Sequence, residues 1–203
     1  MRNRNGGLVH PGAFIPAAER YNLISEIDRW VVSHVCRCLS RAGGPARLCF
    51  INLSGQTMGD ETFPAFIREQ LSRFRIDASR ICFEITETAA ITNLHNAVRF
   101  MCEIKSEGCS FALDDFGTGL SSFAYLKSIP ADYLKIDGEF VRAMIEDPMD
   151  NAIVEAIHQI GKVAGMRTIA EFVEDEKTLR MLETLNVNYA QGFHVGKPAL
   201  EAA

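Results

Sequence analysis

The sequence of 203 residues has no apolar run near the roughly 18 residues that a membrane-spanning helix requires. Its polar start, Met-Arg-Asn-Arg-Asn-Gly-Gly, lacks the apolar core of a secretory signal peptide. There is no excess of basic residues either, and the net charge of −5 argues against sequence-independent binding to nucleic acid. We therefore expect a cytoplasmic protein, or the cytoplasmic part of a longer membrane-attached one. We expect no DNA or RNA partner, and no contact of this domain with the membrane.

The six cysteines form no Cys-x-x-Cys pair and no Cys/His spacing typical of a zinc site. The five histidines are scattered along the chain, so a metal site built from histidine is not expected. The glycine-containing segment 117–122 lacks the Gly-Lys-Ser of a phosphate-binding P-loop. The Asp-Phe-Gly at 115–117 stands without the other signatures of a kinase. These absences leave the thiols as small core residues and exclude zinc, P-loop and kinase chemistry.

Apolar segments of strand length alternate along the chain with segments of helical period. Strands are expected at 48–53, 81–85, 110–113, 133–136, 168–170 and 187–190, and helices at 18–42, 63–74, 92–106, 121–128, 151–164 and 177–185. Such apolar strands, each followed by a helix, indicate a parallel sheet covered by helices. A doubly wound sheet and an eight-stranded barrel both fit this α/β pattern. No linker divides the chain, so we expect one domain over 1–203, although a complete barrel usually takes about 250 residues.

Polar side chains stand at or near the carboxyl ends of the expected strands. They are Asn52, Glu84, Asp114 with Asp115, Lys135 with Asp137, Glu171 with Glu174, and Gln191. In a parallel barrel these ends converge on one face, so the acids among them would meet there. Clustered acids repel one another unless cations neutralise them, and oxygen-only ligands favour magnesium or manganese.

The adjacent Asp114 and Asp115 could serve two metal ions about 3.5–4 Å apart, an arrangement suited to in-line hydrolysis of a phosphodiester. Lys135 would then orient the attacking water or neutralise phosphate charge. Alternatively, Lys135 is an ion-pair partner of the acids with a structural role only.

An ordered series of motifs runs through almost the whole chain: FIPAAE at 14–19, NLS at 52–54, EITE at 84–87, DDFGTG at 114–119, LKID at 134–137, AEFVE at 170–174 and QGF at 191–193. By these motifs the chain resembles the EAL family of bacterial cyclic di-GMP phosphodiesterases, which are often joined to sensory or GGDEF domains. The resemblance implies a modified TIM (β/α)8 barrel. It also implies hydrolysis of cyclic di-GMP to linear pGpG with two Mg²⁺ or Mn²⁺ ions.

The resemblance further implies roles for single residues. The implied metal ligands are Asn52, Glu84, Asp114, Asp115, Glu171 and Glu174, the last acting through a metal-bound water. Asp114 is implied to be shared between the two ions, Lys135 to hold the attacking water, and Glu171 to serve also as general base. Asp137 is implied to lie near the substrate, and Gln191 to support the site.

Glu87 corresponds to the glutamate that anchors the loop 115–122, which includes Phe116 and Gly117. The family uses this loop in dimerisation and in coupling the dimer to activity, so the resemblance implies a homodimer. Glu87 and Glu174 could instead be ordinary carboxylates of a loop or of a helix start.

The Glu-Ala-Leu signature and the arginine after it should precede residues 1–11, and the sequence does not contain them. We therefore expect a barrel that lacks its first strands. A fragment of a longer protein, strands supplied by a second chain, and a degenerate protein remain open as explanations.

Because a metal ligand and a phosphate-binding arginine would be missing, we expect little or no turnover by this chain. A version extended upstream through the signature is expected to be active. The alternative function is a catalytically inactive receptor for cyclic di-GMP, or a protein-interaction module. A purely structural barrel fits poorly with so much buried acidity.

Overall fold

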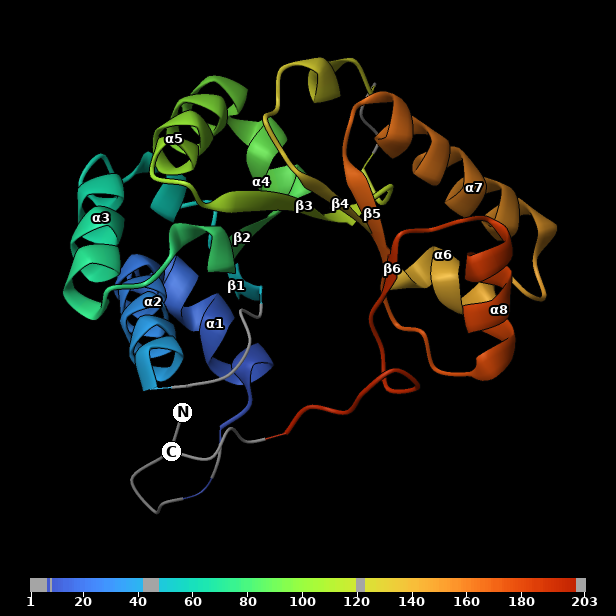
Figure 1. The fold of residues 1–203 in the computed structure, drawn as a ribbon, viewed down its shortest axis with the longest axis horizontal. Helices are drawn as coiled ribbons and strands as arrows, with labels where there is room; N and C mark the ends of the chain where they lie inside the picture. The colour runs from blue at the N-terminus through green and yellow to red at the C-terminus, as the bar shows by residue number, and fades with distance from the viewer. Residues whose placement is uncertain (1–6, 8, 42–47, 120–122, 200–203) are drawn as a thin grey trace.

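The computed structural model describes residues 7, 9–41, 48–119 and 123–199. Its centre is a sheet of six parallel strands that follow one another in chain order (Figure 1). The strands are β1 (Cys49–Asn52), β2 (Ile81–Thr86), β3 (Ser110–Phe116), β4 (Tyr133–Ile136), β5 (Arg167–Ala170) and β6 (Tyr189–Ala190). The sequence left a doubly wound sheet open, but the unbroken strand order excludes it. The expected parallel α/β fold is confirmed, as a sheet curled into part of a barrel.

Helices precede β1 and connect the strands that follow, and several of them cover the outer side of the curved sheet. They are α1 (Pro11–Arg20), α2 (Ile24–Arg41), α3 (Phe63–Phe74), α4 (Glu87–Thr92), α5 (Leu94–Ser106), α6 (Gly138–Ala143), α7 (Pro148–Val163) and α8 (Glu176–Thr184). Figure 1 shows α3, α5 and α7 outside the arc of strands, whose edges are β1 and β6. Among the residues placed by the structure, none of the helices combines the length and apolar character needed to span a bilayer.

The middle strands are almost completely removed from solvent. Phe83 of β2 and Phe111 of β3 are fully buried, and their rings lie 5.8 Å apart. Strands of a parallel sheet that are covered on both faces read as continuous apolar runs, which explains the composition of these segments. Their packing gives the sheet the rigidity with which it presents polar residues at the carboxyl ends of the strands.

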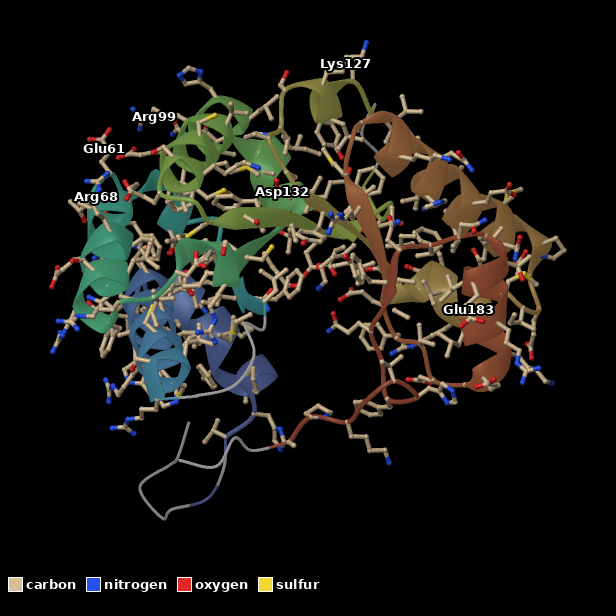
Figure 2. The ribbon with its side chains drawn as sticks, in the orientation of Figure 1. Glu61, Arg68, Arg99, Lys127, Asp132 and Glu183 are labelled. Atoms are coloured by element: carbon tan, nitrogen blue, oxygen red, sulfur yellow. The ribbon has the colours of Figure 1, made fainter. Side chains whose placement is uncertain are left out.

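The amino end of the sheet is tied together by Asp132, which lies just before β4 (Figure 2). Its carboxylate accepts a hydrogen bond from Phe111 N at 2.9 Å and pairs with Lys105 Nζ at 2.5 Å. Its backbone N–H donates to Phe111 O, and its carbonyl accepts from Arg167 N. One residue therefore joins β3, β4 and β5. Figure 2 also shows Arg68 on α3, Arg99 on α5 and Glu61 in the turn before α3. Arg99 pairs with Glu61, and Arg68 pairs with Glu107.

Several expected helices have different boundaries in the structure. The helix expected at 18–42 is two helices, because Asn22 adopts a left-handed conformation with φ of 56° between α1 and α2. The helix expected at 92–106 is α5, which begins at Leu94 because the side chain of Asn93 caps it, and the preceding α4 was not expected. The helix α6 was not expected, and it begins at Gly138, directly after the capping residue Asp137. Of the helix expected at 121–128, the described part is a 3₁₀ turn, Phe123–Lys127, and residues 121 and 122 lie outside the described residues.

His158 of α7 is a buried histidine that packs against β5. Its Nδ1 atom lies 2.7 Å from Thr168 Oγ1, and Thr168 N donates to Asn188 Oδ1 at 2.8 Å. Burial lowers the pKa of His158 below its ordinary value near 6.5, and the nearby Lys162 lowers it further. The folded protein therefore keeps this imidazole neutral at a pH where the unfolded chain binds a proton.

We expect the free energy of unfolding to fall as the pH drops from about 6.5 toward the lowered pKa of His158, because only the unfolded state takes up the proton. In the variant His158→Gln this part of the pH dependence should vanish, while the slope due to carboxyl groups remains. Urea unfolding at several pH values between 5 and 7.5 measures the difference. If the free energy of unfolding had the same pH dependence in the wild type and in His158→Gln, the predicted contribution of His158 would be contradicted.

Candidate active site

Lys135 of β4 lies between three carboxylates from three other parts of the sheet. Its Nζ atom is 2.9 Å from Glu84 Oε1, 2.9 Å from Asp114 Oδ1 and 2.6 Å from Glu171 Oε1. Glu84 belongs to β2, Asp114 to β3, and Glu171 follows β5 directly. All four side chains are buried, and Lys135 is only 2% exposed. The convergence that the sequence predicted at the carboxyl ends of the strands is thus present in the structure.

Asp114 and Asp115 lie within β3 rather than beyond its end, so the strand expected at 110–113 is longer than predicted. Successive side chains of a regular strand point to opposite faces. Here the register of β3 with β4 shifts between Leu113 and Phe116, and Asp115 has a left-handed φ of 52°. This irregularity brings an oxygen of Asp114, one of Asp115 and one of Glu171 within 4.8 Å of one another.

The carboxylates carry more negative charge than Lys135 neutralises. Burial raises the pKa of Glu84 and of Glu171 above the ordinary value, although Lys135 opposes this effect. Burial also acts to lower the pKa of Lys135, but the charges of Glu84 and Asp114 outweigh it, so the net shift is upward. The lysine is therefore charged, and the upward shifts of the two glutamates show that the site disfavours this many ionised carboxylates without a further cation.

These residues fit a divalent metal ion. Asp114 Oδ1 is buried and has no hydrogen-bond partner in the described part of the chain, although it contacts Lys135 as an ion pair. The potential ligands are all oxygen atoms, which suit a hard cation. Such a cation would offset the charge that Lys135 leaves uncompensated.

Two further predicted residues adjoin this cluster. Asn52, at the end of β1, pairs in register with Glu84, and it opposes the rise that burial causes in the pKa of that carboxyl. Asp137 lies close enough to Asp115 to affect its pKa, which is raised first by burial, then by Asp114, and also by Asp137. The carboxylate of Asp137 also accepts from Glu139 N at 2.6 Å and so caps α6.

The sequence pattern predicted that Glu174 and Gln191 belong to the site, but their side chains do not contact the cluster of carboxylates. The side chain of Glu174 is 54% exposed, lies 3.9 Å from Arg142 Nε, and does not belong to the group of carboxylates that could share a metal. The side chain of Gln191 is exposed, while its backbone bonds to Ala170 O and Val173 N. The structure therefore brings neither side chain to the carboxylates.

Glu87, the predicted loop anchor, is fully buried at the start of α4. Its Oε2 atom accepts a hydrogen bond from Gly117 N at 3.1 Å, and its Oε1 atom accepts one from the Tyr125 hydroxyl. Phe116 is fully buried and stacks on Phe123, with ring centroids 5.5 Å apart. The carboxylate thus holds the described part of the loop that follows β3, whose residues 120–122 lie outside the described residues.

The sequence interpretation missed two residues that support the site. Tyr125 contacts Glu87, and nothing in its spacing marked this contact. Asp28 lies on the buried face of α2, whose other members are Ile24, Val32 and Cys36. The sequence could have indicated it, because a carboxylate occupies one position in a series of otherwise apolar residues spaced four apart.

Phe172 occupies an unusual position at the rim of the site. Its φ of 52° is left-handed, and its side chain is 47% exposed beside Glu171. The Arg142 guanidinium lies 4.0 Å from the centre of the ring. Gly138 permits this arrangement, because a Cβ atom there would lie 2.0 Å from the Phe172 ring.

An open cavity of about 610 Å³ lies next to Asn52, between α1, α2, α4 and the carboxyl ends of β1 and β2. Its polar lining includes Glu19, Asp28, Asn52, Ser54, Thr86 and Asn93. The site therefore combines a buried acidic cluster with adjoining space for a small molecule.

Comparisons with known proteins agree on one family. The EAL domain matches residues 1–198. Cyclic di-GMP phosphodiesterase PdeB of Shewanella oneidensis is 42% identical over 95% of this chain, and PdeF of Escherichia coli is 37% identical over 98%. The chain spans 23% and 27% of the lengths of these two relatives.

Solved structures show the same fold. The phosphodiesterase PaMucR in complex with c-di-GMP has a TM-score of 0.92 and 34% identity, over 98% of this chain and 82% of the other. The FimX EAL domain of Xanthomonas citri, also with c-di-GMP, has a TM-score of 0.90 and 30% identity, over 98% of this chain and 80% of the other. With its acidic cluster at the strand ends, the chain belongs to the EAL domain family.

Proposed function

We propose that this chain carries the metal-binding residues of a phosphodiesterase domain that hydrolyses cyclic di-GMP to linear pGpG with two Mg²⁺ or Mn²⁺ ions. The observation that carries the proposal is the group of oxygens from Asp114, Asp115 and Glu171, gathered within 4.8 Å beside Lys135. The names of the relatives PdeB and PdeF, and the c-di-GMP bound to PaMucR and to FimX, support the choice of substrate.

In this proposal, five residues of the cluster hold the metal: Asn52, Glu84, Asp114, Asp115 and Glu171. When bound, the ions supply Lewis acidity for attack on the phosphodiester. The ammonium group of Lys135 holds the oxygen of the attacking water. Because Glu171 Oε1 lies 2.6 Å from Lys135 Nζ, the same carboxylate is placed to accept a proton from that water.

The substrate would extend from the carboxylates into the adjoining cavity. The exposed Phe172 ring offers a surface on which a purine base can stack, an interaction that nucleotide-binding proteins use widely. Asp137 and Gln191 are proposed to act at the substrate from the carboxyl ends of β4 and β6. The proposed role of Glu174 is less direct: it would reach the metal through a water molecule.

The loop held by Glu87 is proposed to take part in a homodimer. Its support is the pair of contacts that Glu87 makes with Gly117 N and with the Tyr125 hydroxyl. Light scattering across a range of protein concentrations tests this part of the proposal. A strict monomer under every condition would remove it without affecting the proposed chemistry.

Turnover of cyclic di-GMP tests the proposed function directly. We expect a form of this chain extended upstream through a Glu-Ala-Leu segment to produce pGpG in Mn²⁺ or Mg²⁺, and to stop when EDTA removes the ion. The 203-residue chain is expected to show little or no turnover. Liquid chromatography of the products measures both. Binding of cyclic di-GMP by the extended form without cleavage would favour the alternative, a receptor.

A further inference from the structure

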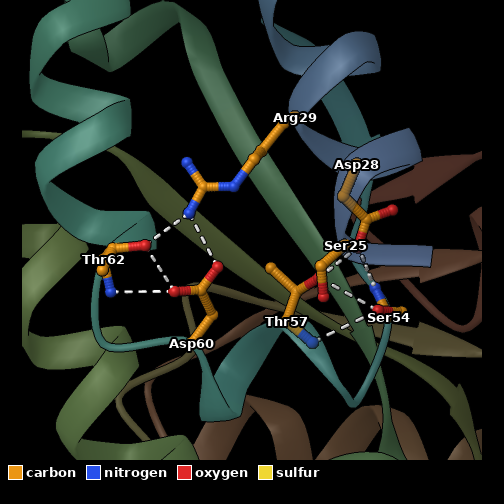
Figure 3. Close-up of polar contacts among 7 residues, drawn as sticks. All are labelled: Ser25, Asp28, Arg29, Ser54, Thr57, Asp60 and Thr62. Carbon is orange, nitrogen blue, oxygen red and sulfur yellow. Dashed lines mark hydrogen bonds and ion pairs between the residues drawn. The ribbon is translucent and has the colours of Figure 1, made fainter. Parts of the chain in front are cut away.

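The segment that follows β1 is held by a carboxylate from α2. Asp28 is 6% exposed, and its Oδ2 atom accepts hydrogen bonds from Ser54 N at 2.9 Å and from Thr57 Oγ1 at 2.6 Å (Figure 3). Thr57 Oγ1 is also 3.2 Å from Ser25 Oγ and 3.0 Å from Ser54 Oγ. One buried oxygen of a helix therefore organises the turn between β1 and the 3₁₀ turn Thr57–Gly59.

This turn begins immediately after Asn52. Leu53 N donates to Glu84 O at 2.8 Å, and the next N–H, that of Ser54, donates to Asp28. The backbone leaving Asn52 is thus held by β2 on one side and by α2 on the other. Within the described residues β1 pairs only with β2, whereas a strand in the middle of a sheet is held by a neighbour on each side. The contact from α2 therefore restrains the end of β1 on the side where no second strand does.

We propose that Asp28 is a positioning residue that holds Asn52 against the carboxylate cluster. The inference rests on the proposed function, and it adds a residue that would never touch the metal. Side chains that orient metal ligands from outside the ligand set typically change metal affinity about 10–100-fold when mutated.

The chemistry of Asp28 favours this role over simple packing. Asp28 occupies a position on the buried face of α2 whose other members, Ile24, Val32 and Cys36, are apolar. A hydrophobic side chain at this position would avoid the cost of burying a carboxylate. Among the described residues Asp28 forms no ion pair, since the neighbouring Arg29 pairs with Asp60 at 2.7 Å instead. A buried anion satisfied by neutral donors is suited to hold a backbone turn.

A second aspartate that bonds to α2 offers a matched control. Asp60 Oδ2 accepts from Arg29 of α2, while its Oδ1 atom accepts from Thr62 N at 2.9 Å and from Thr62 Oγ1 at 2.6 Å (Figure 3). This network ties α2 to the start of α3 and makes no bond to residues 52–54. Removing it disturbs a comparable set of hydrogen bonds without releasing the turn after Asn52.

The experiment compares Asp28→Leu, Asp28→Asn and Asp60→Leu in the 203-residue chain, with Mn²⁺ binding measured by titration calorimetry. We expect Asp28→Leu to weaken Mn²⁺ binding by about tenfold or more, and Asp60→Leu by less than about twofold. Asp28→Asn should stay within about threefold of the wild type, because one amide oxygen can accept both hydrogen bonds that Oδ2 accepts.

Hydrogen exchange without metal provides a second readout. Asp28→Leu should speed exchange of the amides in segment 52–58, and Asp60→Leu should leave that segment protected. Equal Mn²⁺ affinity in Asp28→Leu and the wild type would overturn the proposal, as would equal losses in the two leucine variants. If the wild type binds no Mn²⁺, the proposed function fails, and hydrogen exchange alone decides whether Asp28 holds the segment.

A milder variant covers the case in which Asp28→Leu does not fold. Thr57→Val keeps the shape of the side chain and removes one of the two donors to Asp28. We expect it to weaken Mn²⁺ binding about threefold and to speed exchange in segment 52–58. Wild-type behaviour of Thr57→Val in both measurements would then overturn the proposal.

Discussion

Replacing Asp114 by alanine is expected to abolish cleavage of cyclic di-GMP in the upstream-extended form, lowering kcat/KM by at least about 10³-fold. Asp114 lies at the centre of the cluster, in contact with Lys135 and within 4.8 Å of the nearest oxygens of Asp115 and Glu171. Without it, the proposed pair of ions loses the ligand that the two are expected to share. Initial rates of pGpG formation at saturating Mn²⁺ measure the effect.

The same substitution should leave the metal-free fold intact or make it slightly more stable. Asp114 Oδ1 is a buried oxygen without a hydrogen-bond partner in the described part of the chain, and its removal relieves repulsion among the carboxylates. Glu155→Ala, at an exposed position of α7, provides the control and should keep full activity. Turnover by Asp114→Ala within tenfold of the parent would refute the proposed site, and unfolding of the variant would refute the charge argument.

The second large effect is expected for Lys135→Met in the metal-free protein. The variant keeps a long side chain but leaves Glu84, Asp114 and Glu171 without their buried cation. Removing one partner of a buried ion pair usually costs about 3–5 kcal/mol in the free energy of unfolding. Urea denaturation in EDTA measures this loss, and saturating Mn²⁺ should restore much of it because the metal supplies the missing positive charge.

Lys105→Met is the matched control for this prediction. Lys105 also pairs with an aspartate, Asp132, but both side chains are partly exposed, so we expect a loss of about 1 kcal/mol or less. If Lys135→Met and Lys105→Met lowered the free energy of unfolding equally, the carboxylate cluster would not depend on the positive charge of Lys135. Turnover separates the two interpretations of Lys135: a purely structural lysine predicts normal rates in Lys135→Met at saturating Mn²⁺, whereas a lysine that holds water predicts a severe loss.

Much of the architecture follows from local pattern. The strand 133–136 was predicted with its observed bounds, because Asp132 before it and Asp137 after it mark both ends of the segment. The helix 63–74 was predicted with equal accuracy, and Arg75 ends it in a left-handed conformation with φ of 54°. The predicted helix 18–42 was wrong at Asn22, because an asparagine can either continue a helix or interrupt it, and packing decided between the two. The predicted helix 92–106 is α5, which begins at Leu94.

The candidate site divides in the same way. Recurrence of acids at successive strand ends predicted the convergence of Glu84, Asp114 and Glu171, since parallel strands in one sheet present their carboxyl ends together. The pattern could not show that Glu174 turns outward to Arg142, because the backbone after β5 leaves the sheet at Phe172 in a left-handed conformation. Nor could it show that one lysine contacts all three carboxylates.

By itself, the order of apolar and polar residues determined a parallel α/β sheet and the end of it at which acids gather, because both depend on periodicity along the chain. Only the tertiary structure decided which side chains meet, for contacts between residues distant in sequence depend on register and on local irregularity. The shifted register of β3 that turns Asp115 toward Asp114, and the oxygen of Asp28 that holds the turn after Asn52, are both of this kind.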